Sequence, residues 1–175
     1  APFKGDPTPE QIHLALSNVD GMAVSWCSYI DSEKTPPQPA SAVVKFGTSP
    51  GVHDHITSGA LRTYDVGLFG GWHGWISDVV LRPLVPGTRY YYVVGDGTNF
   101  SMEYSFVQPI QGGSKPTVMA AFGDQGTTIP VGFEVSALLS KHLTSGLAFD
   151  VVAHIGDLCY ATMAFGDSHE WELVW

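Results

Sequence analysis

The sequence predicts a two-layer β-sandwich followed by the start of a separate α/β domain. Residues 10–108 contain short runs in which apolar and polar residues alternate between turn-forming residues, the pattern of half-buried antiparallel strands. A cluster of Gly, Pro and Ser interrupts this pattern between residues 108 and 116. After the cluster, two apolar runs flank a stretch with helical spacing, which is typical of a parallel strand–helix–strand unit.

Residues 1–110 are expected to form the sandwich from strands joined by tight turns. The first alternating runs lie at residues 12–16, 22–26 and 43–45. Asp20-Gly21 predicts a hairpin between the first two runs, with positive φ at the turn residues. Trp26 is the expected central aromatic residue of the core, and Cys27 a small buried residue. The only other cysteine, Cys159, falls in the second domain, so we expect no disulfide between the two.

The stretch Leu84-Val85-Pro86-Gly87-Thr88-Arg89-Tyr90 is the most informative part of the first domain. A Pro-Gly turn that leads into an aromatic-rich strand resembles the corner before the penultimate strand of fibronectin type III and related sandwiches. In those folds a Tyr hydroxyl ties the corner down. The predicted fold class of the first domain is therefore a fibronectin type III/Ig-like β-sandwich. Its Tyr and Trp residues are expected to pack the core, the alternative being an aromatic ligand-binding surface.

Residues 111–116 are expected to be a linker, and residues 117–175 the incomplete N-terminal part of the α/β domain. Its predicted parallel strands, 118–122 and 149–155, end at Gly123-Asp124 and Gly156-Asp157, and a helix between them is predicted to stop at Gly146. Because the carboxyl ends of parallel strands share one edge of a sheet, Asp124 and Asp157 are expected to converge on one site. Carboxylates are hard metal ligands, so the pair predicts a metal site, although either Gly-Asp alone would be read as a turn.

The charge of the chain limits its partners. Lys and Arg number 8 against 17 Asp and Glu, a formal net charge of −9, with no basic cluster. A nucleic acid or an anionic membrane surface is therefore not an expected partner, and no apolar run is long enough to span a membrane. The tripeptide Asn99-Phe100-Ser101 lies in a Gly- and Asp-rich turn and predicts glycosylation of Asn99, hence a secreted or lumenal setting.

Asp124-Gln125-Gly126 followed by Gly156-Asp157-Leu158-Cys159-Tyr160 resembles the D-x-G and G-D-x-x-Y blocks of the purple acid phosphatases, within the metallophosphoesterase superfamily. The sandwich in front resembles that family's fibronectin-like N-terminal domain. The resemblance implies an acid phosphatase that hydrolyses small phosphate monoesters at a dinuclear metal centre. It implies Asp124 as a ligand of the first metal, Asp157 as a bridge between both metals and Tyr160 as a phenolate ligand of the first. The implied metals are Fe(III) and a second divalent ion, Fe, Zn or Mn, and no catalytic residue is assigned apart from these ligands.

The family pattern also contains an Asn-His block and two later His blocks, which do not occur in this sequence. The remaining ligands are therefore expected beyond Trp175, and the chain alone is expected to be inactive. A homo-oligomer, or a second chain that completes the catalytic domain, stays open as a partner. His53 and His55 are expected on the surface, and His154 as a hydrogen-bonded residue in the core or behind a metal ligand.

Two other function classes stay open at this stage. One is a related metallophosphodiesterase or nucleotidase, for which Tyr160 would be incidental. The other is a non-enzymatic β-sandwich binding module with a short α/β extension, in which Asp124 and Asp157 hold no metal.

Overall fold

The structure of the protein is a computed structural model, which describes residues 6–31, 37–63, 73–110, 112–113, 116–126, 131–146 and 149–157. The contacts divide the chain into two units, Ala1–Gln111 and Gly112–Trp175. The division falls at the start of the stretch expected to be a linker.

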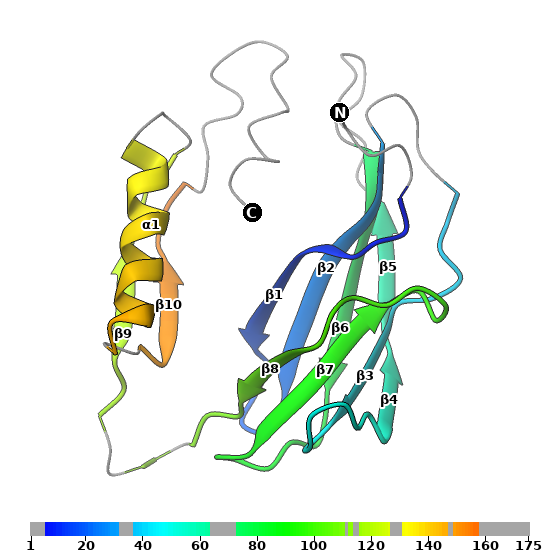
Figure 1. The fold of residues 1–175 in the computed structure, drawn as a ribbon, viewed down its shortest axis with the longest axis horizontal. Helices are drawn as coiled ribbons and strands as arrows, with labels where there is room; N and C mark the ends of the chain where they lie inside the picture. The colour runs from blue at the N-terminus through cyan, green and yellow to red at the C-terminus, as the bar shows by residue number, and fades with distance from the viewer. Residues whose placement is uncertain are drawn as a thin grey trace. The chain divides into compact units, whose positions relative to one another are not determined.

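Unit 1 contains two four-stranded antiparallel sheets in its described part, seen as separate layers in Figure 1. The first sheet has the strand order β1-β2-β6-β5, and the second the order β4-β3-β7-β8. Two facing antiparallel sheets confirm the predicted β-sandwich. The first sheet consists of β1 (Glu10–Leu16), β2 (Met22–Asp31), β6 (His73–Leu81) and β5 (Ala60–Thr63), and the second of β4 (His55–Ser58), β3 (Val43–Gly47), β7 (Arg89–Gly95) and β8 (Tyr104–Val107).

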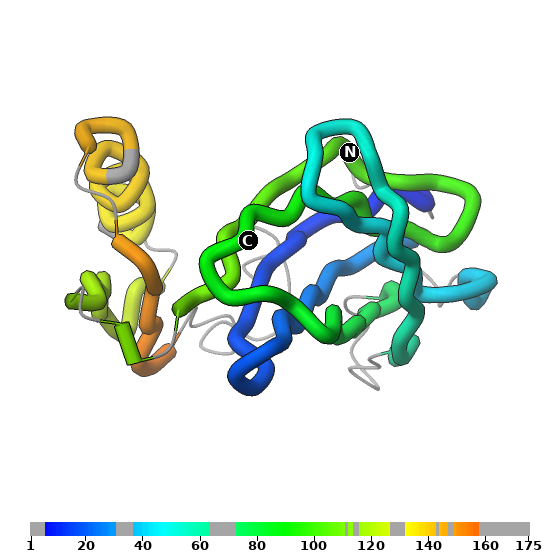
Figure 2. Tube along the Cα trace, turned by 90° about the horizontal axis from the view of Figure 1, so that it is seen from below, coloured from blue at the N-terminus to red at the C-terminus, as the bar shows by residue number. Residues whose placement is uncertain are grey.

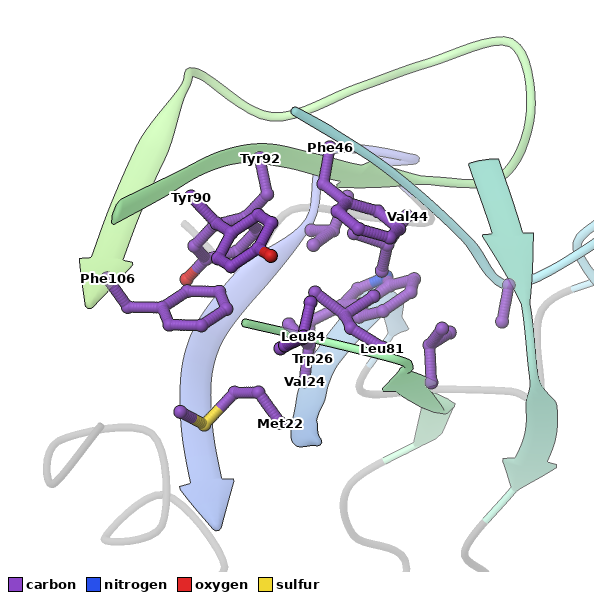
Figure 3. Close-up of a cluster of buried hydrophobic side chains, with 13 residues drawn as sticks. Met22, Val24, Trp26, Val44, Phe46, Leu81, Leu84, Tyr90, Tyr92 and Phe106 are labelled. Atoms are coloured by element: carbon purple, nitrogen blue, oxygen red, sulfur yellow. The ribbon is translucent and has the colours of Figure 1, made fainter. Parts of the chain in front are cut away.

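The core of unit 1 lies between the two sheets and follows from the alternation along the strands. On β2 and β7 every second residue is buried, and Trp26 is only 1% exposed. Figure 3 shows Phe46 and Tyr92 of the second sheet pointing towards Trp26 and Leu81 of the first. Aromatic rings meet at centroid distances of 5.8–6.1 Å, within the range that favours edge and offset contacts. The aromatic residues named here are therefore core packing, as expected. The ring pairs at these distances are Phe46–Tyr90, Tyr90–Phe106 and Tyr92–Phe106.

The corner before β7 contains the predicted hydrogen bond to a tyrosine hydroxyl. The backbone N–H of Val85 donates to the hydroxyl of Tyr90 over 3.0 Å. Leu84, beside it, is 3% exposed and belongs to the core, and its N–H donates to the carbonyl of Asp20 over 2.8 Å. The corner is thus fixed both to its own strand and to the β1–β2 turn.

The β1–β2 hairpin forms, but not with the predicted turn geometry. The two strands pair antiparallel as far as Leu16 and Met22, and the N–H of Ser17 donates to the carbonyl of Gly21. The left-handed residue of this longer turn is Asn18, with φ of 61°, rather than Asp20 or Gly21. Asn tolerates the left-handed region because its short side chain can bond locally, so a two-residue turn is not needed to reverse the chain.

Unit 2 contains a strand–helix–strand unit, as expected. β9 (Met119–Phe122) and β10 (Val151–His154) pair in parallel, with Phe122 opposite His154. Between them α1 (Val131–Thr144) ends just before Gly146, whose φ of 86° suits a helix stop. Both views of the fold place α1 beside the strand pair (Figure 2).

The two strands of unit 2 are less covered than the sequence predicts. Met119 is 56% exposed and Val152 is 51% exposed, although continuous apolar runs predict strands buried on both faces. Among the described residues this sheet has only two strands, so it lacks the neighbours that would cover them. No helix in the described part of the chain is long and apolar enough to cross a membrane.

We predict that Tyr90→Phe lowers the free energy of unfolding of the sandwich by about 1 kcal/mol, because it removes one hydrogen bond and leaves the ring in place. Urea denaturation followed by tryptophan fluorescence measures this. Tyr91→Phe is the matched control, since Tyr91 lies on the outer face of the same strand, and it should unfold like the wild type. Equal effects of the two substitutions would contradict a structural role for the corner bond.

Candidate functional sites

The loops that follow β9 and β10 are joined by reciprocal hydrogen bonds that bring the two predicted aspartates together. The backbone N–H of Asp157 donates to Oδ1 of Asp124 over 2.9 Å. In return, the N–H of Gln125 donates to the carbonyl of Asp157 over 3.1 Å. The strand pairing continues into the loops, because the N–H of Ile155 donates to the carbonyl of Phe122 over 2.6 Å.

The backbone at this edge is held in an uncommon conformation. Asp124 has a φ of 51°, a region that non-glycine residues rarely adopt outside turns and functional sites. Gly156 has a φ of 127°, and a Cβ atom there would overlap Oδ1 of Asp124. A glycine before Asp157 is therefore required both by its φ and by the close approach of the Asp124 carboxylate.

The Asp124–Asp157 pair has the donor chemistry that a hard cation needs. Asp124 uses Oδ1 for the N–H of Asp157, which leaves its Oδ2 and the carboxylate of Asp157 as anionic oxygen donors on two exposed residues. Among the described residues, no group of three or more His, Cys, Asp or Glu side chains converges to hold a metal. The pair therefore fits part of a metal site. The predicted phenolate ligand, Tyr160, lies outside the described residues.

Sequence reasoning missed the role of Gln125, the middle residue of the D-x-G block. Its side-chain Nε2 donates to the carbonyl of Gly132 over 3.0 Å and to the hydroxyl of Ser136 over 2.7 Å. Both acceptors lie in the first turns of α1, four residues apart and hence on one face of the helix. That spacing is visible in the sequence, but nothing at position 125 indicates that its side chain reaches the helix.

The structure can be compared with the predicted positions of His53, His55 and His154. His154 packs edge-on against Phe122 with ring centroids 4.7 Å apart, but neither of its buried ring nitrogens has a hydrogen-bond partner among the described residues. The hydrogen bond expected for it is thus not found there. His53 lies 2.9 Å from a carboxylate oxygen of Glu103, and the exposed His55 stacks on Phe46. Both of these histidines belong to unit 1.

Cys27 is only half-buried, rather than fully buried as expected, and it is free. Burial, together with the negative charges of Glu10 and Asp78, raises the pKa of its thiol to about 11. The thiol therefore stays protonated at neutral pH, which makes it a poor metal ligand and nucleophile. Cys159 lies outside the described residues, so the expected absence of a disulfide stays a prediction.

Asn99, the predicted glycosylation residue, is exposed in a turn organised by Asp96. The Asp96 carboxylate accepts hydrogen bonds from the backbone N–H groups of Thr98 and Asn99, at 2.8 and 2.7 Å. Its other oxygen accepts from Nδ2 of Asn99 at 3.0 Å and from the hydroxyl of Tyr29 at 2.6 Å. Nδ2 carries two hydrogens, so this bond leaves one for a glycan linkage.

The same network controls the ionisation of Asp96. Burial alone would raise the pKa of this carboxyl, but the hydrogen bonds from Tyr29, Asn99 and Thr98 outweigh it and hold the pKa at about 2. Burial and the bond to Asp96 raise the pKa of Tyr29 to about 12. Asp96 is therefore charged, and Tyr29 neutral, across the physiological range.

Comparison with known proteins identifies the family. A family model described as "Purple acid Phosphatase, N-terminal domain" matches residues 9–108, which is more than half of the chain. The chain therefore belongs to the purple acid phosphatase family.

Individual relatives extend the similarity across both units. Probable purple acid phosphatase 20 of Arabidopsis thaliana is 35% identical over 159 residues, covering 90% of this chain and 33% of the relative. Fe(3+)-Zn(2+) purple acid phosphatase 12 of the same plant is 26% identical over 159 residues, covering 90% of this chain and 31% of the relative. The structure of purple acid phosphatase PPD1 from seeds of yellow lupin (Lupinus luteus) matches the fold with a TM-score of 0.74 at 24% identity, covering 96% of this chain and 32% of that one. The chain spans about a third of the length of the relatives it matches.

We predict that Asp96→Ala lowers the free energy of unfolding at pH 7 by about 1–3 kcal/mol, because several donors lose a charged acceptor. The pKa of Asp96 is lowered in the folded state from its ordinary value of 3.8 to about 2. Its contribution to stability is thus complete above pH 3.8 and is lost as the pH falls through about 2. Urea denaturation at pH 7 and near pH 2 should show the wild type and the variant converging in acid.

The control for this prediction is Asp54→Ala, because the carboxylate of Asp54 is 64% exposed and lies at 3.6 Å from an exposed imidazole. Such surface pairs contribute little to stability. If the difference in the free energy of unfolding between wild type and Asp96→Ala were the same at pH 7 and near pH 2, the charge of Asp96 would not be what stabilises the turn.

Proposed function

We propose that this chain supplies the sandwich domain and the first metal-binding loops of a phosphatase that hydrolyses phosphate monoesters at a dinuclear metal centre. The observation that carries the proposal is the pairing of Asp124 and Asp157 by a hydrogen bond of 2.9 Å at the end of two parallel strands. Membership of the purple acid phosphatase family supports the reaction class.

In this proposal Asp124 would hold the first metal, and Asp157 would be the ligand shared by both metals. Tyr160 follows Asp157 by three residues and would hold the first metal as a phenolate. A phenol of ordinary pKa near 10 ionises at neutral or acid pH only beside a strong Lewis acid, so a trivalent iron is the proposed first metal. The second metal is Fe, Zn or Mn; one relative is named as an Fe(3+)-Zn(2+) enzyme. When bound, such a pair lowers the pKa of water and neutralises charge on the phosphoryl oxygens.

The contribution of this chain's own residues is to hold the Asp124 carboxylate against the backbone of Asp157 before a metal arrives. The N–H of Asp157 fixes the rotamer of Asp124, which reduces the conformational freedom lost on metal binding. The substrate class is a small phosphate ester, whose anionic group requires the metal charge because the chain itself is acidic.

The proposed setting is a secreted or lumenal compartment with a glycan on Asn99. The support for it is that Asn99 is exposed and keeps one Nδ2 hydrogen outside the Asp96 network. The metal ligands that complete the site, one Asn and three His, are proposed to come from outside residues 1–175. A second subunit or the rest of a longer polypeptide would supply them.

We predict that Asp157→Asn, in the protein that carries the whole site, lowers turnover of an aryl phosphate at least about a hundredfold. The variant keeps the backbone N–H and removes the charge that a bridging ligand needs. Steady-state hydrolysis of p-nitrophenyl phosphate measures the effect. The control is Asp150→Asn just before the same strand, where the amide oxygen can still accept the hydrogen bond from the N–H of Val118. The sandwich should unfold at the same urea concentration in all three proteins. Near-normal turnover by Asp157→Asn would refute the bridging role.

We also predict that Tyr160→Phe removes most of a visible absorption band while part of the hydrolytic activity survives. An iron(III)–phenolate pair absorbs visible light, whereas the attacking water depends on both metals. Absorption spectra and turnover of the iron-loaded wild type and variant test this together. A band of full intensity in the variant would exclude Tyr160 as the phenolate ligand, and a colourless wild type would favour a phosphoesterase without that ligand.

A further inference from the structure

We propose that Gln125 is a positioning residue for the Asp124–Asp157 pair, because its carboxamide fastens the loop that carries Asp124 to the first turns of α1. The inference rests on the proposed function, since it concerns the metal affinity of that same pair. It assigns a role to the middle residue of the D-x-G block, which supplies no metal ligand.

The carboxamide of Gln125 is matched to its acceptors. Its Nε2 has two hydrogens, and two acceptors lie within reach, the carbonyl of Gly132 at 3.0 Å and the hydroxyl of Ser136 at 2.7 Å. A carboxylate of the same shape could accept from the hydroxyl of Ser136 but could not donate to the carbonyl of Gly132, and an aliphatic side chain of the same length could make neither bond. The position therefore requires an amide rather than any residue of similar size.

The backbone of Gln125 connects the same residue to the second loop. Its N–H donates to the carbonyl of Asp157 at 3.1 Å, and the N–H of Asp157 donates to Oδ1 of Asp124 at 2.9 Å. One residue thus links the β9 loop, the β10 loop and α1. Rotation of the Gln125 backbone would break its bond to Asp157 and move Asp124, the residue directly before it.

Close packing between the loop and the helix supports the same linkage. A Cβ atom on Gly132 would overlap the carbonyl oxygen of Gly126, so the start of α1 lies directly against the D-x-G loop. The left-handed φ of 51° at Asp124 also needs support from its surroundings, because such a conformation persists only where neighbouring contacts fix it. The side-chain bonds of Gln125, together with its backbone bond to Asp157, anchor the residue that directly follows Asp124.

The test compares Gln125→Met, Ser136→Ala and the control Ser140→Ala in the protein that carries the whole site. Methionine keeps the length of glutamine and removes the donor; Ser140 lies one turn further along α1 and is exposed. In the metal-free protein, hydrogen exchange measures opening of the amide of Asp157. In the iron-loaded protein, transfer of iron to EDTA measures how firmly the pair holds the metal.

We expect Gln125→Met to accelerate both exchange at Asp157 and iron loss by about five- to tenfold, the size of one or two neutral hydrogen bonds. Ser136→Ala should produce a smaller change in the same direction, because it removes one of the two acceptors. Ser140→Ala should change neither, and the amides of Val44 and Val94 in the sandwich should exchange at wild-type rates in every variant.

The proposal would be overturned if Gln125→Met lost iron to EDTA at the wild-type rate, whether or not the amide of Asp157 opened faster. The side chain of Gln125 would then support the loop without positioning the metal ligands. Equal effects of Ser136→Ala and Ser140→Ala would overturn it as well. A wild-type protein that retains no iron would instead overturn the proposed function. The two failures are distinguishable, because the second appears before any residue is changed.

Discussion

The parallel pairing of β9 with β10 places two loops that are 33 positions apart in the sequence at one edge of one sheet. Every feature of the candidate metal site depends on this pairing. The register that sets Phe122 opposite His154 brings Asp124 within hydrogen-bond distance of Asp157. A shift of the register by one residue would move the N–H of Asp157 away from Oδ1 of Asp124 and break the hydrogen bond between them. Glycine at position 156 allows the two loops to approach in that register, since a side chain there would overlap the Asp124 carboxylate.

The fold of unit 1 could be predicted well because its signals are local. Alternation along β2 and β7 determines which residues reach the core, and the Pro-Gly corner before Tyr90 has a fixed geometry that its own residues impose. The turn after β1 was predicted wrongly for the same reason. Asp20-Gly21 favours a two-residue turn in isolation, but the bond from Leu84 to the carbonyl of Asp20 comes from a segment distant in the sequence. Local propensity could not include that contact.

The candidate site was predictable only in part. The two Gly-Asp pairs after apolar runs predict which two loops meet, since the strand ends are visible in the sequence. The left-handed backbone of Asp124 and the bonds of Gln125 to α1 were not predicted, because they depend on how a loop meets a helix in space. The roles of Asp124 and Asp157 as ligands stay predictions, as does that of Tyr160, which lies outside the described residues.

The two units differ in what holds their functional residues in place. The Asp96 turn in unit 1 adjoins a core with residues such as Val94 that are fully buried, so burial supports its polar network. The aspartate pair in unit 2 follows two short strands, in which Met119 and Val152 are about half exposed and Phe122 and Val151 are only partly buried. The ligands of a metal must be held to within about half an ångström. That precision has to come from directional contacts, which here are the hydrogen bond between the loops, the steric limit at Gly156 and the bonds of Gln125 to α1.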